Sequence, residues 1–152
     1  MIFEKDANLL DFNLGAFIHS CNCFHTMGAG IAYQIKQKYP MLFKADVAHG
    51  RAGDHTRLGK FSWADLPDGK RGYNLYSQFN LGMEKRQTNY EAMYKGLEAI
   101  KMHLTLAPIE NVGVPFNMGC KLGGGSWRVV RAILDDIFEQ GGINLYICKY
   151  EP

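Results

Sequence analysis

Residues 19–32, HSCNCFHTMGAGIA, combine two histidines, two cysteines and a glycine-flanked turn within one short segment. Side chains of these types at this spacing suit three chemistries: a metal site, a reactive thiol, or the binding of phosphate by backbone N–H groups. Each would give the protein a different function, so we weigh them in turn.

The alternation of histidine and cysteine is the case for a metal. On an extended strand, His19, Cys21, Cys23 and His25 would point the same way, and imidazole and thiolate are good ligands for soft metals. However, alternate side chains of a flat strand lie roughly 6–7 Å apart, whereas structural zinc sites use short loops that turn two sulfurs onto one ion. The two remaining cysteines supply no second pair of suitable spacing. We therefore expect no metal.

The thiols themselves are the second candidate. A catalytic cysteine needs a pKa lowered by a basic neighbour or a helix start, and Cys120, in the glycine loop GCKLGGG, is the one candidate for this role. For all four cysteines, at positions 21, 23, 120 and 148, the simpler interpretation is a small buried hydrophobe. Cysteines this few and this dispersed also indicate free thiols rather than a disulfide framework.

Two glycine-rich segments favour phosphate binding. MGAGIA (27–32) and GCKLGGGSW (119–127) each lie between a predicted strand and a predicted helix. Glycine lets the backbone approach a ligand closely, and the first N–H groups of a helix point toward an anion. Two such loops suit a ligand with two phosphates, or one phosphate bound from both sides. We interpret Lys85 and Arg86, which precede a helix, as part of a solvated turn.

The composition limits the class of partner. The chain has 152 residues, 47% of them hydrophobic and 21% charged, which is typical of a globular domain. A formal net charge of +2 provides no long-range field for nucleic acid or anionic membranes, so we expect neither as a partner. The start, MIFEKDANLL, lacks the basic and apolar regions of a secretory signal, and no stretch approaches the length of a membrane span. We expect a cytoplasmic protein with reduced thiols.

The elements that position the glycine loops follow from hydrophobic periodicity and turn residues. The clearest helix begins after Thr88, because Thr88 and Glu91 have capping-box spacing. An apolar stripe follows at three- and four-residue intervals: Tyr90, Met93, Leu97, Ile100 and Leu104. Further helices are predicted over 28–40, stopping at Pro40, and over 126–142, with Gly141 at its end. Strands are predicted over 15–21, 58–66, 72–79, 111–116 and 143–150.

Strands that alternate with helices predict an α/β domain with helices on both faces of the sheet. In such sheets, ligands bind beyond the carboxyl ends of the strands. Since both glycine loops follow a strand and precede a helix, we expect them to converge on one cleft.

These segments resemble those of a known family. HSCNCFHTMGAGIAYQIKQKYP is similar to the corresponding segment of macro domains, especially the ADP-ribose 1″-phosphate phosphatase type. NLYSQF…RQTNYEAM and VPFNMGCKLGGGSW resemble the next two segments of bacterial and phage-like members, in the expected order. KDANLL resembles the first strand and the turn after it. The resemblance covers nearly the whole chain and is loose over 41–70.

The resemblance implies a single macro domain over residues 1–152, folded as a three-layer α/β/α sandwich with a mixed central sheet. Its ligand would be ADP-ribose or ADP-ribose 1″-phosphate, with an ADP-ribosylated protein as a further partner and no cofactor. Asn8 would hold the adenine amine, where many members carry aspartate, and Asn22 would bind the distal ribose. Tyr146 and Tyr150 are candidates to stack on the adenine. The implied ligand-binding residues are Asn8, Leu9, Ser20, Asn22, Gly28, Ala29, Gly30, Ile31, Gly119, Cys120, Gly123, Gly124 and Gly125.

The implied function is hydrolysis of ADP-ribose 1″-phosphate to ADP-ribose and phosphate, with His19 as the catalytic residue. A histidine could orient the water or protonate the leaving oxygen. The alternative is a histidine buried at a strand end with both nitrogens hydrogen-bonded.

Two departures from the family pattern weaken the case for hydrolysis of ADP-ribosyl bonds. Members that hydrolyse ADP-ribosyl-glutamate use a lysine and an aspartate, where this chain has SQFN and Gly123. The larger hydrolase class carries an aspartate after its first glycine loop, and GAGIAYQI has none. A non-catalytic ADP-ribose-binding module and a weak ADP-ribosyl hydrolase acting on modified proteins remain as alternatives.

Overall fold

The computed structural model describes residues 1–80, 85–121 and 123–150. In these residues strands and helices alternate as the sequence predicts. The strands are β1 (Ile2–Asp6), β2 (Ala16–Cys21), β3 (Phe61–Asp65), β4 (Arg71–Tyr76), β5 (Asn111–Pro115) and β6 (Asn144–Lys149). The helices are α1 (Gly30–Lys38), α2 (Pro40–His49), α3 (Tyr90–Leu106) and α4 (Trp127–Phe138), with a short 3-10 helix at His55–Arg57.

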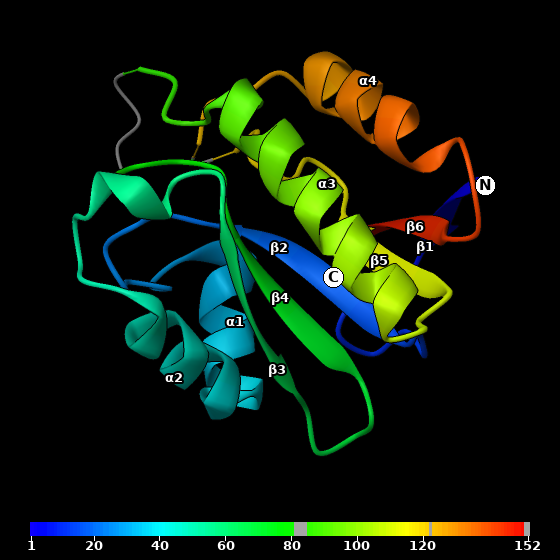
Figure 1. Cartoon of the computed structure of the whole chain (residues 1–152), viewed down its shortest axis with the longest axis horizontal. Coiled ribbons are helices and arrows are strands. Elements are labelled where there is room, and N and C mark those ends of the chain that lie inside the picture. The colour runs from blue at the N-terminus through cyan, green and yellow to red at the C-terminus, as the bar shows by residue number, and fades with distance from the viewer. Residues whose placement is uncertain (81–84, 122, 151–152) are drawn as a thin grey trace.

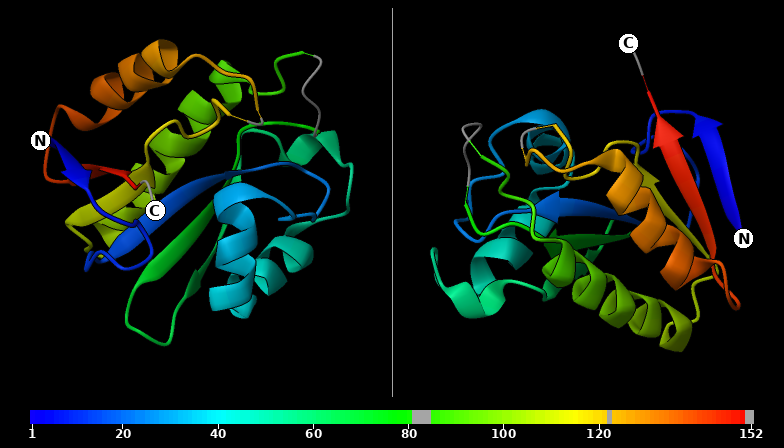
Figure 2. Two further views of the ribbon diagram at one scale, coloured as in Figure 1. Left: turned by 180° about the vertical axis from the view of Figure 1, so that it is seen from behind. Right: turned by 90° about the horizontal axis from the view of Figure 1, so that it is seen from above.

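The strands form one mixed sheet in the order β1-β6-β5-β2-β4-β3. The β3–β4 pair is antiparallel, and the other neighbouring strands are parallel. Helices α1 and α2 cover one face of this sheet and α3 and α4 cover the other (Figures 1 and 2). The predicted fold class, a three-layer α/β/α sandwich with a mixed central sheet, is confirmed.

Strand β2 runs through the middle of the sheet and contributes to the core on both faces. Ala16 and Ile18 pack in the larger core, together with the apolar faces of α3 and α4. Phe17 points the other way, into the smaller core under α1 and α2. Because side chains alternate along a strand, His19 lies on the α1/α2 side and Ser20 on the α3/α4 side. This alternation decides the position of each side chain in the HSCN segment.

The helix predicted over 28–40 is shorter than expected and a second helix follows it. Helix α1 ends at Lys38, and Pro40 occupies the first turn of α2 after a single non-helical residue, Tyr39. Proline is favoured in the first turn of a helix because its missing N–H would have no partner there. Pro40 therefore starts α2 as well as stopping α1, and α2 lies in the region that the sequence left unassigned.

The predicted capping box of α3 is wrong, although its apolar stripe is confirmed. The N-cap is Asn89, whose side chain accepts a hydrogen bond from the N–H of Ala92. The Thr88 hydroxyl donates instead to the carbonyl oxygen of Gly119, at 2.6 Å. The residues of the stripe from Met93 to Leu104 are buried in the larger core, and Tyr90 packs against it. Local spacing cannot separate Thr88 from Asn89, because both are good cap residues.

The described residues contain no helix long and apolar enough to span a bilayer.

Candidate functional site

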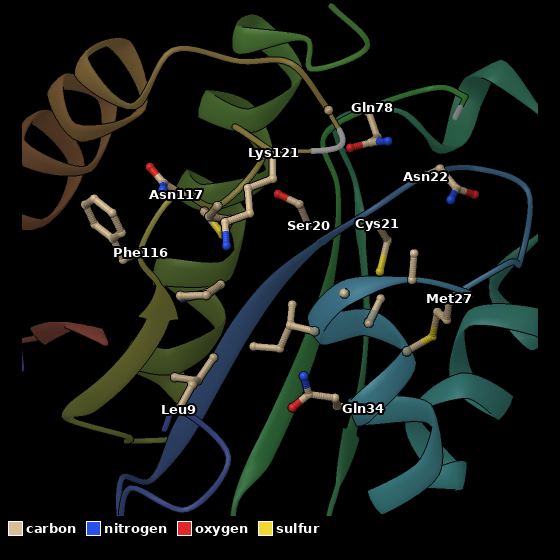
Figure 3. Close-up of a pocket in the computed structure, with 18 of the residues that line it drawn as sticks. Leu9, Ser20, Cys21, Asn22, Met27, Gln34, Gln78, Phe116, Asn117 and Lys121 are labelled. Carbon is tan, nitrogen blue, oxygen red and sulfur yellow. The ribbon is translucent and has the colours of Figure 1, made fainter. Parts of the chain in front are cut away.

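A cavity of about 460 Å³ opens at the carboxyl ends of the parallel strands (Figure 3). It lies where β2, β4, β5 and β6 end and where α1 begins, and segments from both glycine loops line it. Two loops far apart in the sequence therefore meet at one cavity. The predicted binding residues that line it are Asn8, Leu9, Ser20, Asn22, Gly28, Ala29, Gly30, Ile31, Gly119 and Gly123.

Cys120, Gly124 and Gly125 do not line the cavity, contrary to expectation. The Cys120 thiol donates to the carbonyl oxygen of Met118, and burial raises its pKa to about 11. The thiol of Cys120 is therefore not activated. The Gly125 N–H donates to the Gly119 carbonyl oxygen at 2.9 Å, and Gly124 lies against the backbone of Arg86. These contacts of the three residues are with other parts of the protein, and they help to define the conformation of the second loop.

Of the two tyrosines considered for adenine stacking, only Tyr150 lines the cavity. The ring of Tyr146 is stacked on Phe3, with centroids 5.0 Å apart, and contacts Phe12. Lys85 and Arg86 are exposed, which agrees with their interpretation as part of a solvated turn. The Arg86 guanidinium also lies over the ring of Tyr90.

Several lining residues were not predicted. Gln78 lies two residues beyond the end of β4, and Phe116 and Asn117 directly follow β5. The rule that ligands bind at strand ends would have found these three. Asp46 belongs to α2, which had no sequence signal of a site. The others that line the cavity are Cys21, Thr26, Met27, Ala32, Gln34, Pro115, Met118, Lys121, Cys148 and Lys149.

The first glycine loop presents the start of α1 to the cavity. The N-cap residue Ala29 makes no side-chain capping hydrogen bond, so the first N–H groups of this nine-residue helix are not satisfied by a cap. Gly30 has a φ of +57°, which disfavours a side chain at this position. The helix dipole adds partial positive charge at the same place. These N–H groups suit an anionic ligand.

The second glycine loop is held against the segment that precedes α3. The N–H groups of Gln87 and Thr88 donate to the carbonyl oxygen of Gly123, at 2.7 and 3.0 Å. The backbone at Gly123 is so close to its neighbours that an added Cβ would lie 2.4 Å from Thr88 Oγ1 and 2.8 Å from Gln78 Oε1. Gly123 is therefore required by packing, and this position has no room for the aspartate of the glutamate-directed hydrolases.

His19 is not among the residues that line the cavity, which argues against its expected role as the catalytic residue. Its side chain is fully buried on the α1/α2 face of the sheet, where Nε2 lies 2.6 Å from Asn74 Oδ1. Burial lowers the pKa of His19 to about 4, so the ring is neutral at pH 7. It has no contact with the space a ligand would fill. The alternative of a buried, hydrogen-bonded histidine at a strand end fits this position.

The Asn74 side chain continues a buried polar network below the cavity. Its Nδ2 donates to Ser62 Oγ, which lies 2.8 Å from the Tyr76 hydroxyl, and that hydroxyl donates to Asp46 Oδ1 at 2.7 Å. Arg57 Nη2 donates to the same Asp46 oxygen, also at 2.7 Å. Asp46 lines the cavity, but its carboxylate is committed to this ion pair and hydrogen bond.

The cysteines at the strand end are not activated. Cys21 lines the cavity, but burial raises its pKa well above the ordinary range, and its sulfur lies 3.5 Å from the neutral ring of His19. Burial likewise raises the pKa of Cys23 to about 11. Within the part of the chain that is described, no three His, Cys, Asp or Glu side chains are grouped so that they could hold a metal ion.

The polar groups that face the cavity with capacity to bind a ligand are amides, hydroxyls and lysines. Figure 3 shows the Lys121 side chain extending from the second loop into the cavity. Lys149 lies at the end of β6, with its ammonium over the ring of Phe116 at 5.0 Å from the centroid. Ser20 accepts a hydrogen bond from Ser77 and keeps its own hydroxyl proton. The lining therefore favours an anionic ligand rich in hydroxyl groups.

Comparison with known proteins agrees with this fold. No protein-family model matches the sequence. A 17.5 kDa protein from the tk-vs intergenic region of Enterobacteria phage T4 is 30% identical over 137 residues, which cover 88% of this chain and 85% of that protein. The human ADP-ribose glycohydrolase OARD1 is 26% identical over 121 residues, which cover 80% of this chain and 72% of that protein.

Among solved structures, the macrodomain of DarG from Mycobacterium tuberculosis superposes with a TM-score of 0.81 at 25% identity. The match covers 100% of this chain and 98% of that one. An α/β/α sandwich with paired glycine loops at the carboxyl edge of its sheet is the architecture of a macrodomain. The chain belongs to the macrodomain family.

Proposed function

We propose that the protein binds ADP-ribose in this cavity and hydrolyses ADP-ribose 1″-phosphate to ADP-ribose and phosphate. One observation carries the binding: both glycine loops line the same cavity at the carboxyl edge of the sheet, and the first presents the uncapped N–H groups of α1. A diphosphate between the loops would accept hydrogen bonds from the start of α1, and this requires no excess of basic residues. The membership of the macrodomain family supports the same ligand.

We assign the orientation of the bound ADP-ribose from the residues that line the cavity. Asn8, Leu9 and Tyr150, which all line the cavity, form the proposed adenine site. Asn22, beyond β2, forms the proposed distal ribose site. Between them, the diphosphate spans the start of α1 and the second loop. Figure 3 shows the Lys121 ammonium on the other side of Ser20 from Asn22, so this side chain would turn toward the distal ribose to reach its 1″ position.

Lys121 supports a substrate with a further phosphate. Its ammonium is the flexible cation that Figure 3 shows within the cavity, and phosphoryl transfer needs mainly charge stabilisation and a positioned water. Lys121 would bind the 1″-phosphate and stabilise the charge that develops on it. Amides and hydroxyls such as those of Asn22 and Ser20 would orient the attacking water. His19 has no part in this step.

The test measures phosphate released from ADP-ribose 1″-phosphate by the wild type, Lys121→Ala and Lys121→Arg. We expect turnover by the wild type, a loss of at least tenfold in Lys121→Ala, and partial recovery in Lys121→Arg. Lys36→Ala, in the last turn of α1 and not among the residues that line the cavity, is the matched control. Absence of phosphate release together with ADP-ribose binding would refute the phosphatase and leave a binding module. Absence of ADP-ribose binding would refute the site.

Hydrolysis of an ADP-ribosyl bond on a modified protein is the second candidate, because OARD1 is an ADP-ribose glycohydrolase. The chain has Gln78 near the expected lysine and Gly123 at the expected aspartate, so such an activity would need a different set of groups. Release of label from an ADP-ribosylated protein, with no release of phosphate from ADP-ribose 1″-phosphate, would favour this candidate.

A further inference from the structure

The amide of Asn22 is held at both of its polar ends. Its Oδ1 accepts a hydrogen bond from the N–H of Phe24 at 2.8 Å, and its Nδ2 donates to Thr26 Oγ1 at 2.7 Å. The Phe24 N–H can only donate, so it identifies the oxygen of the amide and leaves the nitrogen toward Thr26. One proton of Nδ2 is then used by Thr26, and the second has no partner assigned by these two contacts.

The segment that carries these side chains is a strained turn. His25 and Met27 both have positive φ, at 59° and 37°, which is unfavourable for residues with a side chain. The start of the turn is fixed at Cys23, whose N–H donates to Phe79 and whose carbonyl oxygen accepts from Gly53. Such strain persists only where surrounding contacts determine the conformation. The hydrogen bond from Asn22 to Thr26 joins the start of the turn to its end.

Arg57 binds the backbone of the same turn at Cys23. Its Nη1 donates to the carbonyl oxygen of Cys23 at 3.1 Å, while its Nη2 is bound to Asp46. The backbone of the turn is thus anchored independently of Thr26. Loss of the Thr26 hydroxyl would therefore free the nitrogen end of the Asn22 amide, while the Phe24 N–H still binds its oxygen and the backbone stays anchored.

We propose that Thr26 is a positioning residue, which orients the Asn22 amide so that its second N–H faces the distal ribose. Figure 3 shows Asn22 at the rim of the cavity with its amide nitrogen turned toward the first glycine loop. Both side chains line the cavity. The inference rests on the proposed binding of ADP-ribose and identifies Thr26 as a determinant of specificity for its distal ribose.

The test compares two ligands by calorimetry: ADP-ribose, and ADP, which lacks the distal ribose. Thr26→Val keeps the volume and branching of the side chain but removes the hydrogen-bond acceptor. We expect it to weaken ADP-ribose binding about three- to tenfold, the equivalent of one hydrogen bond, and to leave ADP binding unchanged. Thr26→Ser keeps the hydroxyl and should bind ADP-ribose as the wild type does.

Asn22→Ala tests whether Thr26 acts through Asn22. In that background, Thr26→Val should cause no further loss of ADP-ribose affinity, because the group that Thr26 orients is absent. An equal loss of ADP and ADP-ribose binding in Thr26→Val would show a merely structural role and overturn the inference. The inference would also be overturned if Thr26→Val bound both ligands as the wild type does, or if the losses of Thr26→Val and Asn22→Ala were additive in the double variant. Failure of the wild type to bind ADP-ribose would instead overturn the proposed function, and this inference with it.

Discussion

Thr88 Oγ1 lies 2.6 Å from the carbonyl oxygen of Gly119 and donates a hydrogen bond to it. Thr88 is almost fully buried, and its N–H also binds the carbonyl oxygen of Gly123. Thr88, which precedes α3, therefore binds the second glycine loop at two points, Gly119 and Gly123. The loop owes its shape to a partner from another part of the chain, and this relationship can be tested.

Thr88→Val removes the hydroxyl and leaves the half-buried carbonyl oxygen of Gly119 with only its hydrogen bond from the Gly125 N–H. We expect the free energy of unfolding to fall by about 0.5–1.5 kcal/mol, because this acceptor loses one of its two hydrogen bonds. ADP-ribose and ADP should both bind more weakly, since the second loop would contact the diphosphate that they share. Chemical denaturation and calorimetry measure the two effects. Thr88→Ser, which retains the hydroxyl, is the control, and equal losses in both variants would contradict the prediction.

Gly123→Ala adds a Cβ where Thr88 Oγ1 and Gln78 Oε1 leave no room. We expect a loss of about 1–3 kcal/mol in stability, as is typical of overpacking, together with weaker ADP-ribose binding. Gly142→Ala is the matched control, because an added Cβ there meets no atom within 4 Å. Gly123→Asp should likewise fail to create hydrolysis of ADP-ribosyl-glutamate. Gain of that activity would show that the loop opens more readily than its contacts indicate.

His19→Gln separates a structural histidine from a catalytic one. Since His19 is buried outside the cavity and bonded to Asn74, we expect lower stability with ADP-ribose affinity and phosphate release close to those of the wild type. Thermal denaturation and the phosphate assay give the two readouts at a temperature where the variant remains folded. A large loss of turnover in a folded variant with normal ADP-ribose affinity would show that His19 takes part in catalysis.

The pKa of His19 also predicts how stability depends on pH. The folded ring has a pKa of about 4, against an ordinary value of 6.5, so between these values only the unfolded chain takes up the proton. The contribution of His19 is therefore complete above pH 6.5 and is lost as the pH falls from 6.5 toward 4. The change in unfolding free energy is on the order of 3 kcal/mol. Denaturation measured across this range should show a smaller slope in His19→Gln than in the wild type.

Arg57→Gln breaks the buried ion pair with Asp46 and leaves a carboxylate without its cation at the edge of the cavity. We expect a loss of about 3–5 kcal/mol, which is typical when one partner of a buried pair is removed. Arg131→Gln is the control, because its partners Glu4 and Asp135 are exposed and such pairs contribute about 0–1 kcal/mol. Similar losses in both variants, measured by chemical denaturation, would contradict the importance of the buried pair.

Much of the fold was predictable because its signals are local. The stripe from Met93 to Leu104 repeats with the period of a helix, and the turn between β3 and β4 has typical turn residues. Helix α2 was missed because Pro40 was interpreted only as the end of α1. The cap of α3 was misassigned between two adjacent cap-forming residues. In both cases the local sequence pattern was compatible with two structures, and tertiary packing determined which of them formed.

The candidate site was predictable where backbone chemistry defines it and unpredictable where burial defines it. Segments 27–32 and 119–127 needed only glycines between a strand and a helix, and both contribute to one cavity. The position of His19 depends on its neighbour Asn74, which the register of β2 and β4 places beside it from a distant part of the chain. No spacing within HSCN contains that information.

The amino-acid sequence by itself determined the alternation of strands and helices, the two glycine loops and the edge of the sheet at which they lie. These depend on backbone sterics and hydrophobic period, which act over a few residues. Only the tertiary structure decided that His19 is buried and neutral, that Thr88 holds the second loop, and that Asn22 is bound to Thr26 at the rim of the cavity. Burial and hydrogen-bond partners are properties of neighbours in space, and the sheet brings those neighbours together from distant segments.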